Sequence, residues 1–173
     1  MEAYRVAGPR HTISTDIVSG MGAFLAGGRW NPVGQMKVVY LSHEPETAMK
    51  EALEHFRYHA LPISTALPKV IVAVHVKIER SLDLTDSAIG ADFPIPISEL
   101  LAEDWRAMMA KDVEPASQAV GWAAFAAGFQ GLKVPSKPDP TGMNLVIFPE
   151  RLVKGNRLEV LNAGELDKLG GKR

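Results

Sequence analysis

Residues 69–78 constrain the fold of this chain more than any other segment, because their apolar side chains recur at every second position. Side chains alternate between the two faces of a β-strand, so a period of two predicts a strand. The alternating apolar positions are Val70, Val72, Val74, Val76 and Ile78. This segment is the clearest strand of the sequence.

Shorter apolar runs and amphipathic stretches accompany this strand. The further predicted strands cover residues 37–41, 144–148 and 157–161. The predicted helices cover residues 45–59, a segment capped by Ser98, and a segment from Pro115 to near Gly128. Strands and helices mix without a regular strand–helix–strand alternation, which favours an α+β fold over a doubly wound sheet.

The composition is that of one folded domain. The chain has 173 residues, of which 46% are hydrophobic and 23% charged, and a chain of this length buries enough surface to need no disulfide. It has no cysteine, which excludes disulfides, thiolate nucleophiles and cysteine-ligated metals. We expect one domain over residues 1–163, followed by a flexible tail over residues 164–173.

The charge and hydropathy of the chain limit its partners. A net charge of −1 argues against direct nucleic-acid binding driven by electrostatics. No apolar run approaches the roughly 18 residues of a membrane span. The first ten residues lack the charged and then apolar regions of a secretion signal, so we expect a cytoplasmic protein that binds no membrane.

Residues 79–114 are unusually acidic, with nine acidic side chains against three basic ones. A solvated acidic surface is one interpretation of this stretch. The other is a docking surface for a basic partner.

Several common sites are absent from the sequence. There is no phosphate-binding loop of the GxxxxGK[ST] type and no GxSxG nucleophile motif. Glu51, His55 and His59 recur on adjacent turns of the helix predicted over residues 45–59, and all three are suitable metal ligands. Each four-residue step rotates about 40° around a helix, so the three side chains would not converge easily, and we expect no metal site.

A glycine-framed turn at residues 27–34 is the most informative stretch for function. Arg29 follows two glycines and is followed by Trp30 and Asn31. A guanidinium is a planar fork for phosphate or carboxylate, and glycines let a ligand approach closely. Alternatively, Arg29 stabilises a loop by donating hydrogen bonds to backbone carbonyls. Residue chemistry alone leaves both interpretations open.

Two further polar residues are ambiguous when taken singly. Glu51 lies about 130° around its predicted helix from the apolar stripe, which favours a solvated position. Ser136 lies in a loop between two apparent strands, where site residues are often carried, although a turn serine is the simpler interpretation.

Together these pieces resemble the RES domain, a family named for an arginine, a glutamate and a serine. The segments GGRWNPVG and VVYLSHEPETAMKEALEH are similar to the first block of the family, and GLKVPS and GMNLVIFPE to its closing block. With the opening YRVAGPR, the resemblance covers most of residues 4–150.

The resemblance implies the site residues. Its four catalytic positions fall on Arg29, Tyr40, Glu51 and Ser136. Glu54 competes for the glutamate role, but the spacing to the following histidine favours Glu51. The resemblance places further dinucleotide contacts on Trp30, Asn31 and Asn144, beside Arg29 and Tyr40.

The resemblance also implies a function. RES proteins are toxins of bacterial toxin–antitoxin pairs, and their fold resembles that of ADP-ribosyltransferases of the diphtheria-toxin type. Members cleave NAD+ by hydrolysis or phosphorolysis, and some relatives transfer ADP-ribose to a protein. We therefore expect NAD+ as substrate, inorganic phosphate as a candidate co-substrate, no added cofactor, and an oligomeric complex with an Xre-type antitoxin. A catalytically inactive antitoxin-binding module is the remaining alternative.

Overall fold

A computed structural model describes residues 1–170, except for the side chains of His55 and of residues 90–92. Seven strands form one mixed sheet in the order β4-β5-β6-β2-β1-β3-β7. The strands are β1 (Glu2–Ala7), β2 (Val39–Ser42), β3 (Val70–Lys77), β4 (Ser81–Asp83), β5 (Gly131–Pro135), β6 (Met143–Ile147) and β7 (Arg157–Val160). The β4–β5 pair is parallel and the other pairs are antiparallel, which confirms the predicted α+β class.

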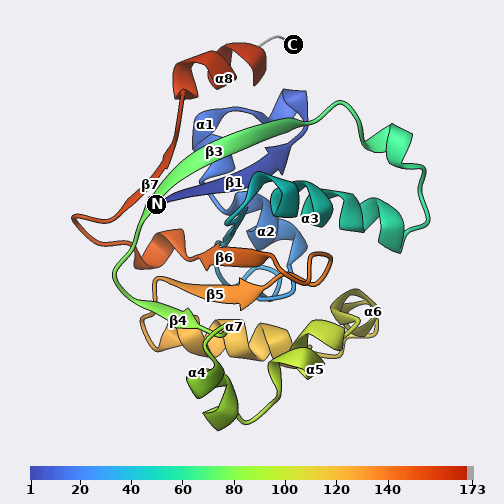
Figure 1. Ribbon diagram of the computed structural model, residues 1–173, viewed down its shortest axis with the longest axis vertical. Helices are drawn as coiled ribbons and strands as arrows, with labels where there is room; N and C mark the ends of the chain where they lie inside the picture. Colours follow the sequence, from blue (N-terminus) through green and yellow to red (C-terminus); the bar gives the residue numbers. More distant parts are fainter. Residues whose placement is uncertain (171–173) are drawn as a thin grey trace.

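The helices gather around the sheet rather than alternating with its strands (Figure 1). They are α1 (Ser14–Ile17), α2 (Met21–Ala26), α3 (Pro45–Tyr58), α4 (Ser87–Asp92), α5 (Ile97–Ala102), α6 (Trp105–Met109), α7 (Ala116–Ala126) and α8 (Ala163–Gly170). Helix α3 packs against β1, β2 and β3, whereas α7 packs against β5. Within residues 1–170, no helix is long and apolar enough to cross a membrane.

Both faces of the central strands are buried. In β6, Leu145 and Ile147 belong to a core with β1 and β3, while Val146 belongs to a second core with β5 and α7. The same alternation in β2 sends Leu41 into the first core and Tyr40 toward the second. Strands that are buried on both faces read as continuous apolar runs, which is the pattern that residues 37–41 and 144–148 show.

The four predicted strands are confirmed, but three other predictions need correction. The helix expected after Ser98 is two helices, α5 and α6, because Asp104 accepts a hydrogen bond from Ala107 N (3.1 Å) and caps a new helix. Ser98 lies inside α5, whose N-cap position is Pro96. Strand β1 was not predicted.

The expected flexible tail is also different in the structure. Residues 163–170 form helix α8, and residues 171–173 lie outside the described part of the chain. Thr12 Oγ1 donates to Leu166 O (3.0 Å), and Asp167 accepts from Ser14 N (2.6 Å). These hydrogen bonds join α8 to the segment around α1. Leu166 also packs against the first core.

Candidate active site

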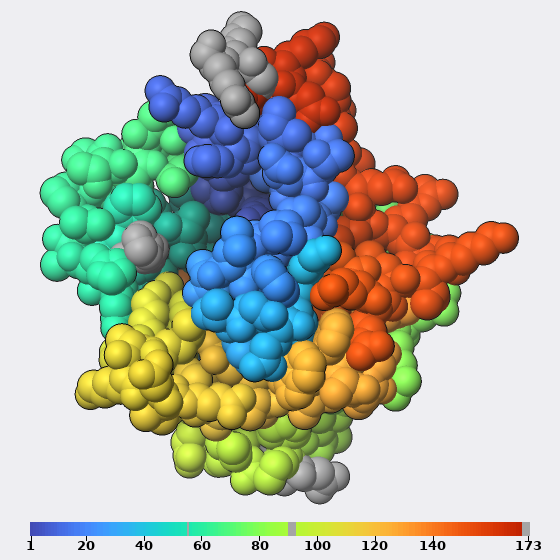
Figure 2. Space-filling model, turned by 180° about the vertical axis from the view of Figure 1, so that it is seen from behind, coloured from blue at the N-terminus to red at the C-terminus, as the bar shows by residue number. Residues whose placement is uncertain are grey.

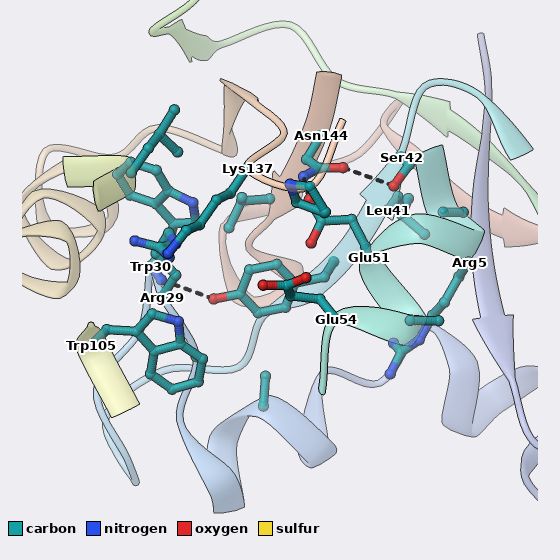
Figure 3. Close-up of a pocket in the computed structure, with 18 of the residues that line it drawn as sticks. Arg5, Arg29, Trp30, Leu41, Ser42, Glu51, Glu54, Trp105, Lys137 and Asn144 are labelled. Atoms are coloured by element: carbon teal, nitrogen blue, oxygen red, sulfur yellow. Dashed lines mark hydrogen bonds between the residues drawn. The ribbon is translucent and has the colours of Figure 1, made fainter. Parts of the chain in front are cut away.

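A cavity of about 400 Å³ lies where α3, the segment at residues 27–30, the α5–α6 region and the loop after β5 meet. Figure 2 shows the face opposite to that of Figure 1, where the segment around α2 lies beside both α3 and the α5–α6 region. Arg29 and Glu51 both line this cavity (Figure 3). Arg29 and Glu51 can act on the same ligand only if they share such a cavity.

Glu51 lies on α3 and is held by one of its two carboxylate oxygens. Ser136 Oγ donates to Glu51 Oε1 (2.7 Å), and Asn144 Nδ2 donates to the same oxygen (2.5 Å). Among the described residues, Oε2 has no hydrogen-bond partner. Helix periodicity favoured a solvated Glu51 because it takes no account of neighbouring elements. In the structure, Ser136 in the loop after β5 and Asn144 on β6 lie against this face of α3.

The amide of Asn144 is itself oriented by a residue that the sequence analysis did not single out. Ser42 and Asn144 are direct partners across β2 and β6, and Ser42 Oγ donates to Asn144 Oδ1 (2.7 Å; Figure 3). With Oδ1 occupied by this bond, Nδ2 is the end of the amide that reaches Glu51. Only the strand register could have revealed this pairing.

Ser136 contacts the Glu51 carboxylate but does not itself line the cavity. Its residue is 4% exposed and is not part of the cavity lining. The loop that carries it is tied to α3 by Asp139, which accepts from Thr47 Oγ1 (2.7 Å) and pairs with Lys50 Nζ (2.8 Å). The hydrogen bonds from Lys50 and Thr47 lower the pKa of Asp139 below its ordinary value.

The structure shows one of the two roles that the residue chemistry of Arg29 left open, and it leaves the other possible. Its Nη1 donates to the carbonyls of Leu100 (2.6 Å) and Glu103 (3.3 Å), so it does stabilise the α5 segment. It also lines the cavity, and Nη2 has no hydrogen-bond partner among the described residues. Burial lowers the pKa of the Arg29 guanidinium, while the carboxylates of Glu51 and Glu103 act in the opposite direction. An arginine remains charged under such shifts.

Tyr40 connects the glycine-framed turn to the sheet. Its hydroxyl accepts from Trp30 N (3.0 Å) and donates to Asn31 Oδ1 (2.8 Å). Gly28 makes this approach possible, since a Cβ at that position would lie within van der Waals overlap of the Tyr40 hydroxyl. Burial raises the pKa of Tyr40 well above its ordinary value, so the phenol stays neutral.

The predicted dinucleotide contacts divide into two groups. Trp30, Tyr40 and Asn144 line the cavity. Asn31 is fully buried and outside the lining, and its amide donates to Ala23 O (2.8 Å) and Pro32 O (3.2 Å). Asn31 therefore shapes the turn behind Tyr40.

The sequence analysis missed several residues of the cavity wall. Arg106 lies over the rings of Trp105 (4.2 Å to the centroid) and Tyr58 (5.0 Å), and all three line the cavity. Lys137, one residue beyond Ser136, lines it as well. Trp105 falls at helical spacing with Leu101, Met108 and Met109, which is typical of a core position, and a lone lysine in a loop carries no signal in a single sequence.

Two carboxylates of the acidic stretch have structural partners. Glu103 accepts from Ala116 N (3.0 Å) and from the amide and hydroxyl of Ser117 (3.0 and 2.7 Å), at the start of α7. Asp104 caps α6 and accepts from the Tyr58 hydroxyl (2.9 Å). Both also line the cavity, so they belong to the architecture of the site.

The alternative metal set of Glu51, His55 and His59 gains nothing from the structure. The side chain of His55 lies outside the described residues. Among the described ones, no group of three or more histidine, aspartate or glutamate side chains is arranged to hold a metal ion.

Comparison with known families identifies the family of this chain. A family model of the RES domain matches residues 2–167. The chain belongs to the RES domain family. Four of the residues predicted for the site, Arg29, Tyr40, Glu51 and Asn144, line one cavity of this RES domain, and Ser136 contacts Glu51.

Two known proteins are similar to this RES domain. A Prs ADP-ribosylating toxin of Sphingobium sp. (strain YBL2) is 35% identical over 69 residues, which are 40% of this chain and 42% of that protein. The chain therefore matches less than half of the length of that relative. A chain of the crystal structure of the M. tuberculosis MbcT–MbcA toxin–antitoxin complex superposes with a TM-score of 0.70 at 24% identity, over 99% of this chain and 89% of the other. That likeness establishes a shared fold.

Proposed function

We propose that this RES domain is the toxin of a toxin–antitoxin pair and cleaves the bond between nicotinamide and ribose in NAD+. One observation carries the proposal: Glu51, fixed through Oε1 by two neutral donors, shares a cavity with the guanidinium of Arg29. A fixed carboxylate and a cation in one cavity suit a substrate that joins a diphosphate to a reacting sugar carbon.

The chemistry follows from the charge that cleavage creates. As the C1–N bond breaks, its electron pair goes to the nicotinamide nitrogen, and positive charge builds on the ribose ring as in glycoside cleavage. The unpartnered Oε2 of Glu51 would stabilise this charge and orient a ribose hydroxyl. Nicotinamide leaves as a neutral molecule, so no strong general acid is required.

The other positions take supporting roles in this proposal. Arg29 binds the diphosphate through its free nitrogen, while Asn144 and Ser136 position Glu51. Tyr40 forms a cavity wall against which the nicotinamide or ribose can pack. Its raised pKa argues against proton transfer by the phenol.

The acceptor distinguishes two versions of the function. In hydrolysis or phosphorolysis, an oxygen of water or inorganic phosphate bonds to the ribose carbon and free nicotinamide is released. In the second version, a protein side chain accepts the ADP-ribose. The similarity over 69 residues to the Prs ADP-ribosylating toxin supports this second version.

The family membership supports three further parts of the proposal. We infer a fold of the diphtheria-toxin type of ADP-ribosyltransferase, an Xre-type antitoxin as partner in an oligomeric complex, and action in the cytoplasm. NAD+ serves as substrate with no added cofactor, and phosphate serves as co-substrate in the phosphorolytic version.

Nicotinamide release from NAD+ by the purified chain tests the proposal directly. Glu51→Gln should abolish release, and the matched Glu54→Gln should retain most of it, because Glu54 lines the cavity without the two donors that fix Glu51. No release by the unmodified chain would refute NAD+ cleavage, and equal loss in both variants would refute the specific role of Glu51. Labelled ADP-ribose, followed with and without phosphate, separates small-molecule products from a modified protein.

A further inference from the structure

Part of the Arg29 guanidinium already forms hydrogen bonds within the protein, without a ligand. Its Nη1 donates to the carbonyls of Leu100 and Glu103, which leaves a limited number of donors for the cavity. A nucleoside diphosphate carries two phosphate groups, whose oxygens are best satisfied by several cationic donors. The site therefore calls for a second cation near Arg29.

Lys137 meets the requirements for such a cation. It lines the same cavity and is exposed, and its ammonium forms no ion pair with any described carboxylate. In Figure 3 its side chain extends from the loop after β5 in the direction of Trp30 and Arg29. Because no carboxylate lies within ion-pair distance of its ammonium, Lys137 breaks no close salt bridge when it binds an anion.

The backbone of Lys137 is held in place by its neighbours. Ser136 N donates to Gly142 O (2.9 Å), and Asp139 ties the loop to α3 through Lys50 and Thr47. A Cβ on Gly142 would lie 2.6 Å from Thr47 Oγ1, so the loop lies directly on the helix. The loop that orients Glu51 through Ser136 thus also sets the position from which Lys137 reaches the cavity.

The neighbouring charged side chains of this wall have contacts of their own. Arg106 stacks over Trp105 and Tyr58, and Asp104 accepts from Ala107 N and the Tyr58 hydroxyl. These two hydrogen bonds lower the pKa of Asp104, with smaller contributions from the charges of Lys137 and Arg106. The exposed ammonium of Lys137, which has no hydrogen bond or close ion pair among the described residues, is thus a donor available on this side.

We propose that Lys137 binds the diphosphate of the dinucleotide together with Arg29. A guanidinium that is hydrogen-bonded to two backbone carbonyls and an exposed ammonium would then bind the same group. This inference rests on the proposed function for the identity of the substrate. It assigns the ligand class as a nucleoside diphosphate and gives Lys137 a binding role. It predicts an effect on affinity for ligands with a diphosphate and none on ligands without one.

Calorimetric binding of ADP-ribose and of adenosine tests this assignment without requiring catalysis. Lys137→Gln should weaken ADP-ribose binding about 3- to 10-fold at low salt, with a smaller difference at high salt because exposed charges are screened. Lys137→Arg should retain most of the affinity. Lys77→Gln makes the same change of charge at an exposed position of β3 outside the cavity, and it should bind like the unmodified chain.

The outcomes separate this inference from the proposed function. Equal affinities of Lys137→Gln and Lys77→Gln for ADP-ribose would overturn it, as would an equal weakening of adenosine binding. If ADP-ribose binding depends on Lys137 but NAD+ is not cleaved, the diphosphate site stands and the proposed reaction fails. If NAD+ is cleaved with the same KM in Lys137→Gln and Lys77→Gln, the reaction stands and the role of Lys137 fails.

Discussion

Replacing Ser136 with alanine distinguishes a residue that contacts the substrate from one that holds the catalytic carboxylate. Ser136 Oγ lies 2.7 Å from Glu51 Oε1, and the residue is 4% exposed and outside the cavity lining. The hydroxyl is therefore placed to hold the carboxylate rather than to bind the substrate. We therefore expect Ser136→Ala to lower kcat for NAD+ cleavage and to leave KM nearly unchanged.

The size of the effect follows from the bond that is lost. A hydrogen bond to a charged group contributes about 1.5–3 kcal/mol, and about 1.36 kcal/mol corresponds to a tenfold change in rate. If this energy serves mainly to orient Glu51, kcat should fall roughly 10- to 100-fold. Asn144 still donates to the same oxygen, so the lower end is expected. The free energy of unfolding should fall by about 1 kcal/mol, because the hydroxyl also accepts from Asp139 N.

The assay is nicotinamide release over a range of NAD+ concentrations, with thermal unfolding of the same sample to establish that the variant is folded. Ser136→Cys is a useful companion, since a thiol is a weak donor and should recover only part of kcat. A large increase in KM with an unchanged kcat would refute the reasoning, because it would mean that Ser136 contacts the substrate.

Three other predictions concern the parts that surround this bond. Ser42→Ala should lower kcat about 2- to 10-fold, since it releases the Oδ1 end of Asn144 without touching Glu51. Gly28→Ala should cost about 1–3 kcal/mol of stability and reduce activity, because the new Cβ would overlap the Tyr40 hydroxyl. Asp139 has a lowered pKa, caused first by its lysine partner and then by its threonine partner, so its stabilisation is present at neutral pH and is lost as the pH falls below about 4. Asp139→Asn should accordingly be less stable at pH 7 and lose less stability between pH 5 and pH 2.

Two of these predictions have a control within the chain. Gly164→Ala is the control for Gly28→Ala, since a Cβ at Gly164 meets nothing within 4 Å in helix α8. Ser19→Ala is the control for Ser42→Ala, because the Ser19 hydroxyl bonds only its own turn, to Asp16 O (2.9 Å) and from Met21 N (3.2 Å). Urea unfolding at pH 7 and at acid pH measures the Asp139 effect. If the stability of the unmodified protein and that of Asp139→Asn changed with pH in parallel, the stabilising role of the Asp139 carboxylate would be contradicted.

The sequence predicted the apolar strands of the sheet better than strand β1, which lies between β2 and β3 but carries polar residues. Strands buried on both faces, such as β6, show as apolar runs, and the alternation in β3 is unmistakable. Strand β1 mixes Tyr4 and Arg5 with alanines, and both of these polar residues lie at the cavity, so its pattern is obscured by the site it helps to form. The break between α5 and α6 depends on a side-chain cap that competes with helix continuation, and apolar periodicity cannot show that competition.

For the site, the sequence and the family resemblance predicted a set of residues, and the fold shows where each of them lies. Ser136 was expected to orient the substrate, whereas the structure places it behind Glu51. Asn31 was expected at the ligand, whereas it lies behind Tyr40. Ser42 was missed because its partner is 102 positions away in the chain and is adjacent only through strand register.

The structure also explains why the two interpretations of Arg29 are compatible rather than competing. A guanidinium has five N–H donors in a rigid plane, so it can use one nitrogen to hold the carbonyls of Leu100 and Glu103 and still present another to an anion. The carbonyl contacts fix its position before a ligand binds, which reduces the ordering cost of binding. Glu51 follows the same principle on the opposite side, with Oε1 fixed by Ser136 and Asn144 and Oε2 left to the cavity. In both residues, the atoms engaged in the fold set the direction of the atoms that remain for the substrate.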